Sequence, residues 1–171
     1  MTQTHAPDRR LFLTGAAASA FALAACGAEA KPNAAEMAFA NSPFRKLSEA
    51  DWRKRLSPAA FDVLRKEGTE RPGSSPLDNE KRRGTFVCAG CSLPLFRSES
   101  KFDSGTGWPS FVTSIKGSMG TKRDLILLIP RTEYHCARCL GHQGHIFDDG
   151  PANRGGQRWC NNGVALKFVP T

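Results

Sequence analysis

Two pairs of cysteines place the tightest constraint on how this chain can fold. The pairs are Cys88-Ala-Gly-Cys91 and Cys136-Ala-Arg-Cys139, and 44 residues lie between them. Two thiolates on one tight turn can occupy two corners of a tetrahedron, and a second turn can supply the other two. The gap is longer than in a compact zinc ribbon, so a piece of the domain is expected to be inserted between the turns.

The four cysteines have two other possible roles. They could form two disulfides, an alternative that export from the cytoplasm would make more plausible. A redox-active CxxC is a third interpretation, which two matched copies disfavour. We expect one structural Zn²⁺ on these four residues, because each turn follows a short strand, and four thiolates leave no open position for a substrate.

The chain from Thr85 onward has the pattern of a small β domain. Short β-branched or aromatic segments, separated by turn residues, lie at 85–88, 125–129, 134–136, 145–147 and 164–169. Before them, Ser48 begins a capping-box-like helix through Leu56, and Ser57-Pro58 opens a second helix that Gly68 closes. We therefore expect a mainly β, antiparallel domain with short N-terminal helices packed outside it.

The N-terminal segment has the layout of an export signal. Residues 8–26 hold a twin arginine and then an uncharged stretch that is too short to span a bilayer. Adjacent arginines before Leu-Phe-Leu resemble the twin-arginine signal, and residues 23–26 (LAAC) resemble a lipobox. Residues 1–25 are therefore interpreted as a cleaved signal and Cys26 as the lipidated N-terminus. A plain signal cut after Ala30 is the alternative.

A flexible tether is predicted over residues 26–43, which are rich in alanine and have no sustained period. It would join the lipid to a single domain over residues 44–171. We expect an exported protein on the periplasmic side, anchored to the membrane through the lipid.

The charge of the chain gives little support to a nucleic-acid partner. Removal of residues 1–25 leaves 22 basic and 15 acidic residues, which lowers the formal charge from +8 to +7. No run of lysines or arginines resembles a nucleic-acid-binding arm, so we expect no such partner.

The sixth cysteine, Cys160, lies in a segment predicted to be a strand. Val164, Leu166 and Phe168 alternate with other residues, and extending that period back places Arg158, Cys160 and Asn162 on one face. A neighbouring arginine lowers the pKa of a thiol and enriches the nucleophilic thiolate. A buried, inert cysteine is the alternative, which the polar neighbours disfavour.

Two histidines follow the second CxxC turn. His142 and His145 are flanked by Gly141 and Gly144, which allow sharp turns that could bring both rings to one place. Each could instead be an ordinary surface or core residue. A metal already bound by four sulfurs does not need them.

These motifs together resemble the methionine sulfoxide reductase B family. The similar stretches are KFDSGTGWPSF (101–111), RTEYHCARC (131–139), GHQGHIFDDGP (141–151) and RWCNNGVALKF (158–168), and the match covers about residues 44–170. The resemblance implies reduction of methionine-R-sulfoxide, mainly in proteins, by a two-sheet β-tent domain with structural zinc. It places the nucleophile on Cys160 and other site residues on Trp108, His142, His145, Asn162, Arg158 and Asp149.

The chemistry of a sulfoxide fits these residues. The reaction needs a thiolate aimed at sulfur and an acid that gives a proton to oxygen. We expect Cys160 to be the thiolate and His145 the acid, with His142 and Asn162 orienting the acid or a bound water. Trp108 would face the S-methyl group, and Phe111 would extend that apolar wall. The product on the cysteine is a sulfenic acid.

Two stretches depart from the family pattern. Thr106 occupies the loop in which many members carry a resolving cysteine, so we expect an external thiol to reduce the sulfenic acid. The chain reads CNNG at 160–163 where members usually read CINS, and Asn161 and Gly163 are predicted to loosen the site. Two other functions stay open: a non-enzymatic zinc module, and a hydrolase using a Cys160/His145 pair.

Overall fold

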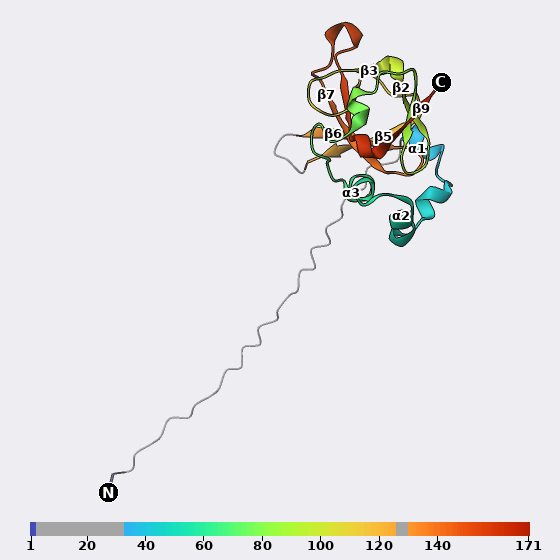
Figure 1. Ribbon diagram of the computed structural model, residues 1–171. Helices are drawn as coiled ribbons and strands as arrows, with labels where there is room; N and C mark the ends of the chain where they lie inside the picture. Colours follow the sequence, from blue (N-terminus) through green and yellow to red (C-terminus); the bar gives the residue numbers. More distant parts are fainter. Residues whose placement is uncertain (3–32, 126–129) are drawn as a thin grey trace.

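The computed structural model describes residues 1–2, 33–125 and 130–171, and the export signal, Cys26 and most of the 125–129 segment lie outside that part. Three short α-helices come first along the chain (Figure 1): α1 Ala34–Met37, α2 Glu49–Arg55 and α3 Pro58–Lys66. Nine strands follow, at β1 Gly84–Cys88, β2 Pro94–Arg97, β3 Lys101–Phe102, β4 Ser110–Phe111, β5 Met119–Asp124, β6 Arg131–Cys136, β7 His142–Phe147, β8 Arg158–Asn161 and β9 Leu166–Pro170. Single 3₁₀ turns lie at Pro43–Lys46, Pro76–Asn79, Ser98–Ser100, Ala152–Arg154 and Gly163–Ala165.

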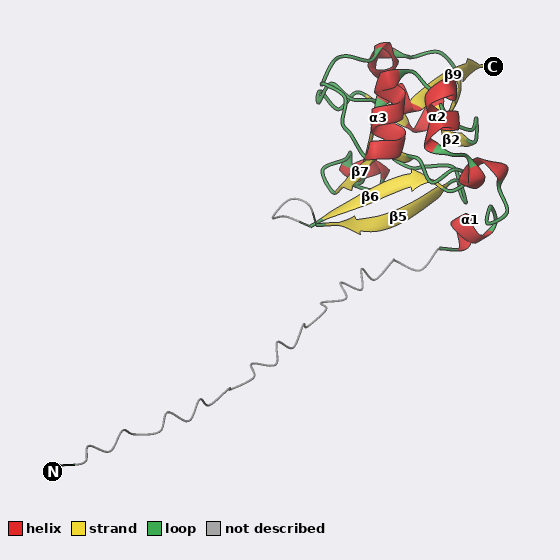
Figure 2. Ribbon diagram, turned by 90° about the horizontal axis from the view of Figure 1, so that it is seen from below, coloured by secondary structure: helices red, strands yellow, loops and turns green. Residues whose placement is uncertain are grey.

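Two antiparallel sheets form the domain. The smaller has the strand order β2-β1-β9, and the larger has the order β3-β4-β8-β7-β6-β5. Figure 2 shows β5 and β6 as a long adjacent pair, with α2 and α3 lying beside the strands. The mainly β, two-sheet prediction is confirmed. No helix in the described ranges is long and apolar enough to cross a membrane.

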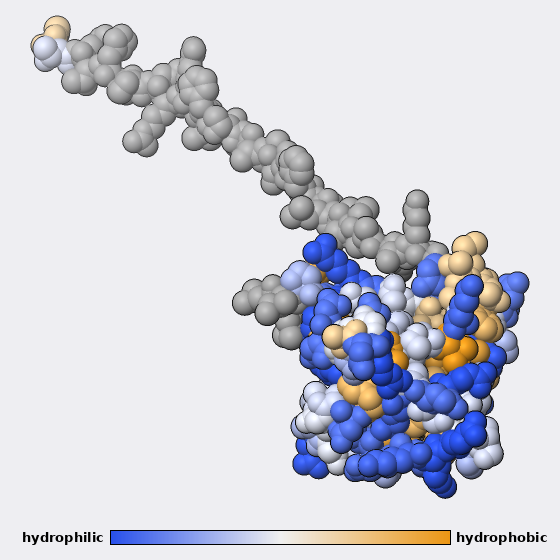
Figure 3. All heavy atoms as spheres, turned by 90° about the horizontal axis from the view of Figure 1, so that it is seen from above, coloured by the Kyte–Doolittle hydropathy of each residue, from blue (hydrophilic) through white to orange (hydrophobic). Residues whose placement is uncertain are grey.

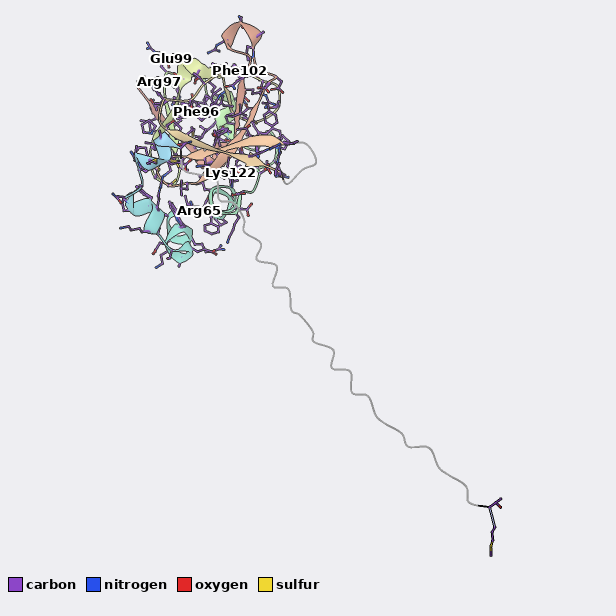
Figure 4. The ribbon with its side chains drawn as sticks, turned by 180° about the vertical axis from the view of Figure 1, so that it is seen from behind. Arg65, Phe96, Arg97, Glu99, Phe102 and Lys122 are labelled. Carbon is purple, nitrogen blue, oxygen red and sulfur yellow. The ribbon has the colours of Figure 1, made fainter. Side chains whose placement is uncertain are left out.

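Aromatic side chains fill the space between the sheets. Phe96 from the small sheet stacks on Phe111 from the large one, with centroids 3.9 Å apart, and Phe86 meets Phe111 edge-on at 5.0 Å. Tyr134 and Trp159 extend this cluster on the large sheet, with centroids 4.9 Å apart. Figure 4 shows Phe96 within the domain. The outer face seen in Figure 3 is mostly hydrophilic, with small separate hydrophobic patches.

The predicted caps of both helices are present. Ser48 and Asp51 form a reciprocal capping box at α2, and the Ser57 hydroxyl accepts a hydrogen bond from the Ala60 amide at α3. The helix α3 ends in the left-handed region at Glu67, one residue before the predicted Gly68. Trp52 of α2 and Phe61 of α3 are buried, so the helices cover the core with their apolar faces.

Residues 33–43 differ from the predicted tether. They form α1, whose Glu36 carboxylate lies 3.1 Å from the His135 ring of β6, and the Arg45 guanidinium binds the Glu36 carbonyl oxygen at 2.7 Å. Phe39 packs against the core. These long-range contacts, which have no local sequence signal, attach the segment to the domain.

The predicted strand over residues 158–169 is broken in two. β8 belongs to the large sheet and β9 to the small one, and the 3₁₀ turn Gly163–Ala165 redirects the chain between them. A side chain at Gly163 would bring its Cβ to 2.0 Å from the Ser75 hydroxyl, so with Ser75 in this position glycine leaves the room that the turn needs. Leu125, at the start of the predicted 125–129 strand, is exposed and outside any strand.

Candidate metal centre and active site

The four CxxC cysteines meet in one buried cluster. Their sulfur atoms all lie within 4.8 Å of one another, with Cys88 Sγ 3.6 Å from Cys139 Sγ and Cys91 Sγ 3.5 Å from Cys136 Sγ. A tetrahedral Zn²⁺ with bonds of about 2.3 Å separates its sulfur ligands by about 3.8 Å, so the cluster has the size of that site. A disulfide needs about 2.05 Å, and all four thiols are free.

The two turns that carry these cysteines have the same backbone design. The Ser92 amide donates to the Cys88 carbonyl at 2.8 Å, and the Leu140 amide donates to the Cys136 carbonyl at the same distance. Ser92 and Leu140 both adopt left-handed backbone conformations, with φ of 59° and 58°. Each turn thus aims two sulfurs at one point, the expected knuckle geometry.

Crowding of the thiols makes a cation the natural occupant of the cluster. Hydrogen bonding with Cys136 and the other thiols, followed by burial, raises the pKa of Cys88 well above its usual value. Four buried thiolates without a positive charge would repel one another, and a divalent ion removes that cost.

A row of opposed residues crosses five strands of the large sheet. Cys160 of β8 is paired with Ser110 of β4 and with His145 of β7, and His145 is paired with Glu133 of β6, itself opposite Lys122 of β5. Residues paired across neighbouring strands project from the same face, with Cβ atoms about 5 Å apart. The pairing register therefore brings the predicted nucleophile next to the predicted acid.

A small pocket of about 140 Å³ opens at this row. Its walls are formed by Thr69, Trp108, Arg131, Gly144, His145, Phe147, Cys160, Asn161 and Asn162. It combines one thiol, one imidazole and two aromatic rings, with part of the wall polar. A pocket of this size accepts a single side chain rather than a large cofactor.

The loop around Trp108 is held in place from two sides. The Trp108 indole nitrogen donates to the Glu70 carbonyl oxygen at 3.1 Å. Gly107 has φ +84°, and a Cβ there would lie 2.8 Å from the Gly73 nitrogen. Only glycine fits this close approach, and the Trp108 ring is held half-buried at the pocket.

Cys160 experiences two opposing effects. Burial raises the pKa of its thiol above the usual value, while the charge of Arg158 and a hydrogen bond from its side chain act to lower it. The predicted arginine effect is present, but burial outweighs it. The Arg158 guanidinium also binds both oxygens of Asp149 at 2.8 Å and lies 4.4 Å above the centre of the Phe147 ring.

The two histidines have different carboxylate partners. The His145 Nε2 atom lies 2.8 Å from Oδ2 of Asp124, and the His142 Nδ1 atom lies 3.0 Å from Oε1 of Glu133. The His142 ring is 2% exposed and does not line the pocket, although its centroid is 5.4 Å from that of His145. His145 is therefore the histidine that can reach a substrate in the pocket.

A buried network of amides supports the strand beneath Cys160. The single proton of the Tyr134 hydroxyl is shared between two acceptors, the Cys160 carbonyl at 3.0 Å and the Asn161 Oδ1 atom at 2.9 Å. The Asn162 side chain donates to the Gln143 carbonyl at 3.0 Å and accepts from the Glu70 amide at 3.0 Å. Asn161 and Asn162 are thus held by several hydrogen bonds, and the loosening of the site by the CNNG departure stays a prediction.

The buried amide network also contacts the cysteine cluster. The Gln143 side-chain nitrogen lies 3.5 Å from Cys88 Sγ, and its side-chain oxygen accepts a hydrogen bond from Asn161 at 3.4 Å. Gln143 is fully buried. It therefore links the cysteine cluster to the residue that follows Cys160.

Phe111, which was predicted to line the substrate pocket, lies outside it. Phe111 is fully buried in the aromatic core and does not line the pocket, whereas Phe147 does. In β4, Phe111 follows Ser110, which is opposite Cys160, so its side chain projects to the other face.

Sequence reasoning also missed Thr69, Arg131 and Asp124. Arg131 and Glu133 alternate in the RTEYHC motif, so a period of two could have indicated a shared face. No pattern around Asp124 distinguishes it from an ordinary surface residue.

Known proteins have sequences similar to this one. The SelR domain family model matches residues 56–170. A "Peptide methionine sulfoxide reductase MsrB" of Bradyrhizobium diazoefficiens is 48% identical over 72% of this chain and 88% of its own. The "Peptide methionine sulfoxide reductase B1, chloroplastic" of Arabidopsis thaliana is 43% identical over 88% of this chain and 74% of its own.

A third relative, the MsrB of Pseudomonas putida, is 49% identical over 70% of this chain and 90% of its own. Among solved structures, a Mis18 "Yippee-like" domain is 16% identical and aligns with a TM-score of 0.41 over 53% of this chain and 98% of that one, a likeness too slight to support an argument. The resemblance inferred from the motifs is confirmed, and the chain belongs to the SelR domain family, that of the type B methionine sulfoxide reductases.

Proposed function

We propose that this protein reduces methionine-R-sulfoxide, mainly in oxidised proteins and peptides, to methionine. One observation carries the proposal: Cys160 and His145 are direct cross-strand neighbours in a pocket that Trp108 and Phe147 also line. Membership of the SelR family supports methionine sulfoxide reduction. A thiol beside an imidazole supplies the nucleophile and the proton that such a reduction needs.

The proposed reaction transfers one oxygen atom from the sulfoxide to Cys160. The Cys160 thiolate attacks the sulfoxide sulfur, and His145 gives a proton to the sulfoxide oxygen. The oxygen transfers to Cys160, so the thiol is oxidised to a sulfenic acid while the sulfoxide is reduced to methionine. Asn162 stays fixed at the pocket wall by its two backbone hydrogen bonds and orients the reacting groups.

The aromatic walls select the substrate. Trp108 and Phe147 offer apolar surface to the S-methyl group, since sulfur and methyl groups pack favourably against rings. With the methyl group there, the oxygen near His145 and the peptide chain directed to the pocket mouth, only one hand of a tetrahedral sulfoxide fits, and the relatives named MsrB support the R epimer as that hand. We therefore expect turnover of the R epimer and little or none of the S epimer, measured separately by chromatography on peptides of known configuration. Preference for the S epimer would overturn the proposal.

The metal cluster holds a structural Zn²⁺ in this proposal, bound by Cys88, Cys91, Cys136 and Cys139. When bound, the ion offsets half of the charge of the four thiolates and ties the two knuckles together. Its four ligands are 5% exposed or less, so the metal takes no part in substrate binding.

An external thiol completes the cycle. Four of the five described cysteines form the metal cluster, and the Thr106 hydroxyl hydrogen-bonds with Ser104 at 2.8 Å. A first external thiol would condense with the sulfenic acid, releasing water, and a second would free Cys160 as a new disulfide leaves. The external thiol would come from a thioredoxin-like protein or from a small thiol.

Trapping the oxidised protein tests this step. One equivalent of sulfoxide without reductant is expected to add one oxygen atom to the mass, and dimedone is expected to label Cys160 alone. An intramolecular disulfide that includes Cys160 would contradict the external-thiol proposal. Alkylation of Cys160 beforehand provides the control, since it should block labelling.

Export and lipidation remain a proposal based on residues 1–26 of the sequence. Expression in a bacterial host with labelled palmitate is expected to label the wild-type chain and to leave a Cys26→Ala variant unlabelled, with wild-type activity in the membrane fraction. Equal labelling of both chains, or none of either, would contradict lipidation at Cys26. The periplasmic location is read from protease access in spheroplasts.

A further inference from the structure

Asp124 makes the main polar contact to the proposed acid. It is the last residue of β5, its side chain is 4% exposed, and its Oδ2 atom lies 2.8 Å from Nε2 of His145. The same oxygen accepts a hydrogen bond from the Arg131 guanidinium at 2.6 Å. Asp124 and Arg131 are themselves opposed across β5 and β6, so sheet register brings both groups to this corner of the pocket.

We propose that Asp124 is a positioning residue for His145, fixing the orientation and tautomer of its ring and stabilising its protonated form, while Arg131 limits that stabilisation. The inference rests on the proposed function, in which His145 handles the proton of the reaction. Asp124 is not among the residues that line the pocket and acts through His145.

The tautomer follows from donor and acceptor chemistry. A carboxylate can only accept hydrogen bonds, so the nitrogen that faces it must carry a proton. Nε2 is therefore the protonated nitrogen of neutral His145, and Nδ1 keeps the lone pair. That lone pair can take the proton of the Cys160 thiol and pass it on to the sulfoxide oxygen.

The electrostatics around the ring are balanced between opposing groups. Burial lowers the pKa of His145 most, the hydrogen bond and charge of Asp124 raise it, and the charges of Arg131 and His142 lower it. Glu133 and Cys160 face the same ring from the neighbouring strands β6 and β8. Asp124 and Arg131 thus act on His145 in opposite directions.

The opposing effects on the pKa of His145 determine how the reaction rate depends on pH. The pKa of His145 lies below its usual value and that of Cys160 above its own. At a pH between these two pKa values, Cys160 and His145 together carry one proton, and in the reactive form this proton is on His145. The rate should therefore follow a bell-shaped curve whose acid limb reports His145 and whose alkaline limb reports Cys160.

Two variants separate positioning from simple support of the fold. Asp124→Asn removes a group that raises the His145 pKa, so the acid limb should move to lower pH. Arg131→Met removes a group that lowers it, so the acid limb should move to higher pH. Asp62→Asn removes an exposed carboxylate on α3 and serves as the matched control, with an unchanged profile.

Direct readouts accompany the kinetics. Long-range ¹H–¹⁵N spectra are expected to place the proton of neutral His145 on Nε2 in the wild type and on Nδ1 in Asp124→Asn, because the asparagine amide can donate to Nε2. In that variant, kcat/KM for the R epimer should fall about 10²-fold. Alkylation of Cys160 by iodoacetamide at neutral pH should fall at least about tenfold, since fewer protons move from thiol to ring.

Shifts of both acid limbs in the same direction, or an unchanged tautomer in Asp124→Asn, would overturn the inference. If Arg131→Met does not fold, the tautomer and alkylation of Asp124→Asn decide alone. Absence of R-epimer turnover by the wild type, together with the expected tautomer and alkylation changes, would overturn the proposed reaction and still support the assignment of Asp124.

Discussion

A Cys160→Ser variant is expected to lose more than about 10³-fold of its kcat/KM for methionine-R-sulfoxide, because the reaction loses the nucleophile that accepts oxygen. A serine hydroxyl has a far higher pKa than a thiol and does not form the equivalent of a sulfenic acid. The measurement is single-turnover reduction of an R-sulfoxide peptide, which also excludes a slow reductant step.

The fold of this variant should be intact. Cys160 is half-buried at the pocket, and its carbonyl, rather than its sulfur, is held by Tyr134. Metal content and thermal unfolding are therefore expected to match the wild type. Residual activity near the wild-type level in a correctly folded variant would show that another group performs the attack.

A Cys136→Ser variant is expected to lose its metal and to unfold at a temperature lower by more than about 10 °C. Cys136 is fully buried at the end of β6, and its knuckle joins that strand to the turn that follows β1. Binding of a structural zinc contributes on the order of 10 kcal/mol in small domains, so loss of one ligand removes much of the stability.

The comparison with Cys160→Ser provides the matched control, since the same chemical exchange is made at a cysteine outside the cluster. Metal is counted by elemental analysis, and unfolding is followed by circular dichroism with and without a chelator. A Cys136→Ser protein that keeps one zinc per chain and the wild-type melting temperature would contradict a structural metal centre.

Local signals in the sequence were enough to predict several elements. The Ser48 and Ser57 caps, the two knuckles and the short strands near Phe86 and Tyr134 depend on neighbouring residues, so propensity and turn chemistry indicate them. Cys160 could be predicted as the nucleophile because polar residues flank it and the four CxxC cysteines share a predicted metal site.

Long-range pairing explains what could not be predicted. β5 has the sequence MGTKRD, too polar to stand out as a strand, and it becomes one because β6 pairs with it along its full length. The two-residue strand β4 is too short for a period of two to settle which face Phe111 occupies. The contact of His145 with Asp124 depends on β5 lying two strands away from β7, which only the fold provides.

The row of opposed residues that runs from β4 through β8, β7 and β6 to β5 also limits which changes in strand length the protein can tolerate. Insertion of one residue within β7 would turn His145 toward the aromatic core, away from Cys160, while leaving every amino acid of the site in the sequence. A substitution at the pocket changes one side chain of the site, whereas a change in strand length would displace several of its side chains at once. Length variation among descendants should therefore collect in the loops and spare these strands.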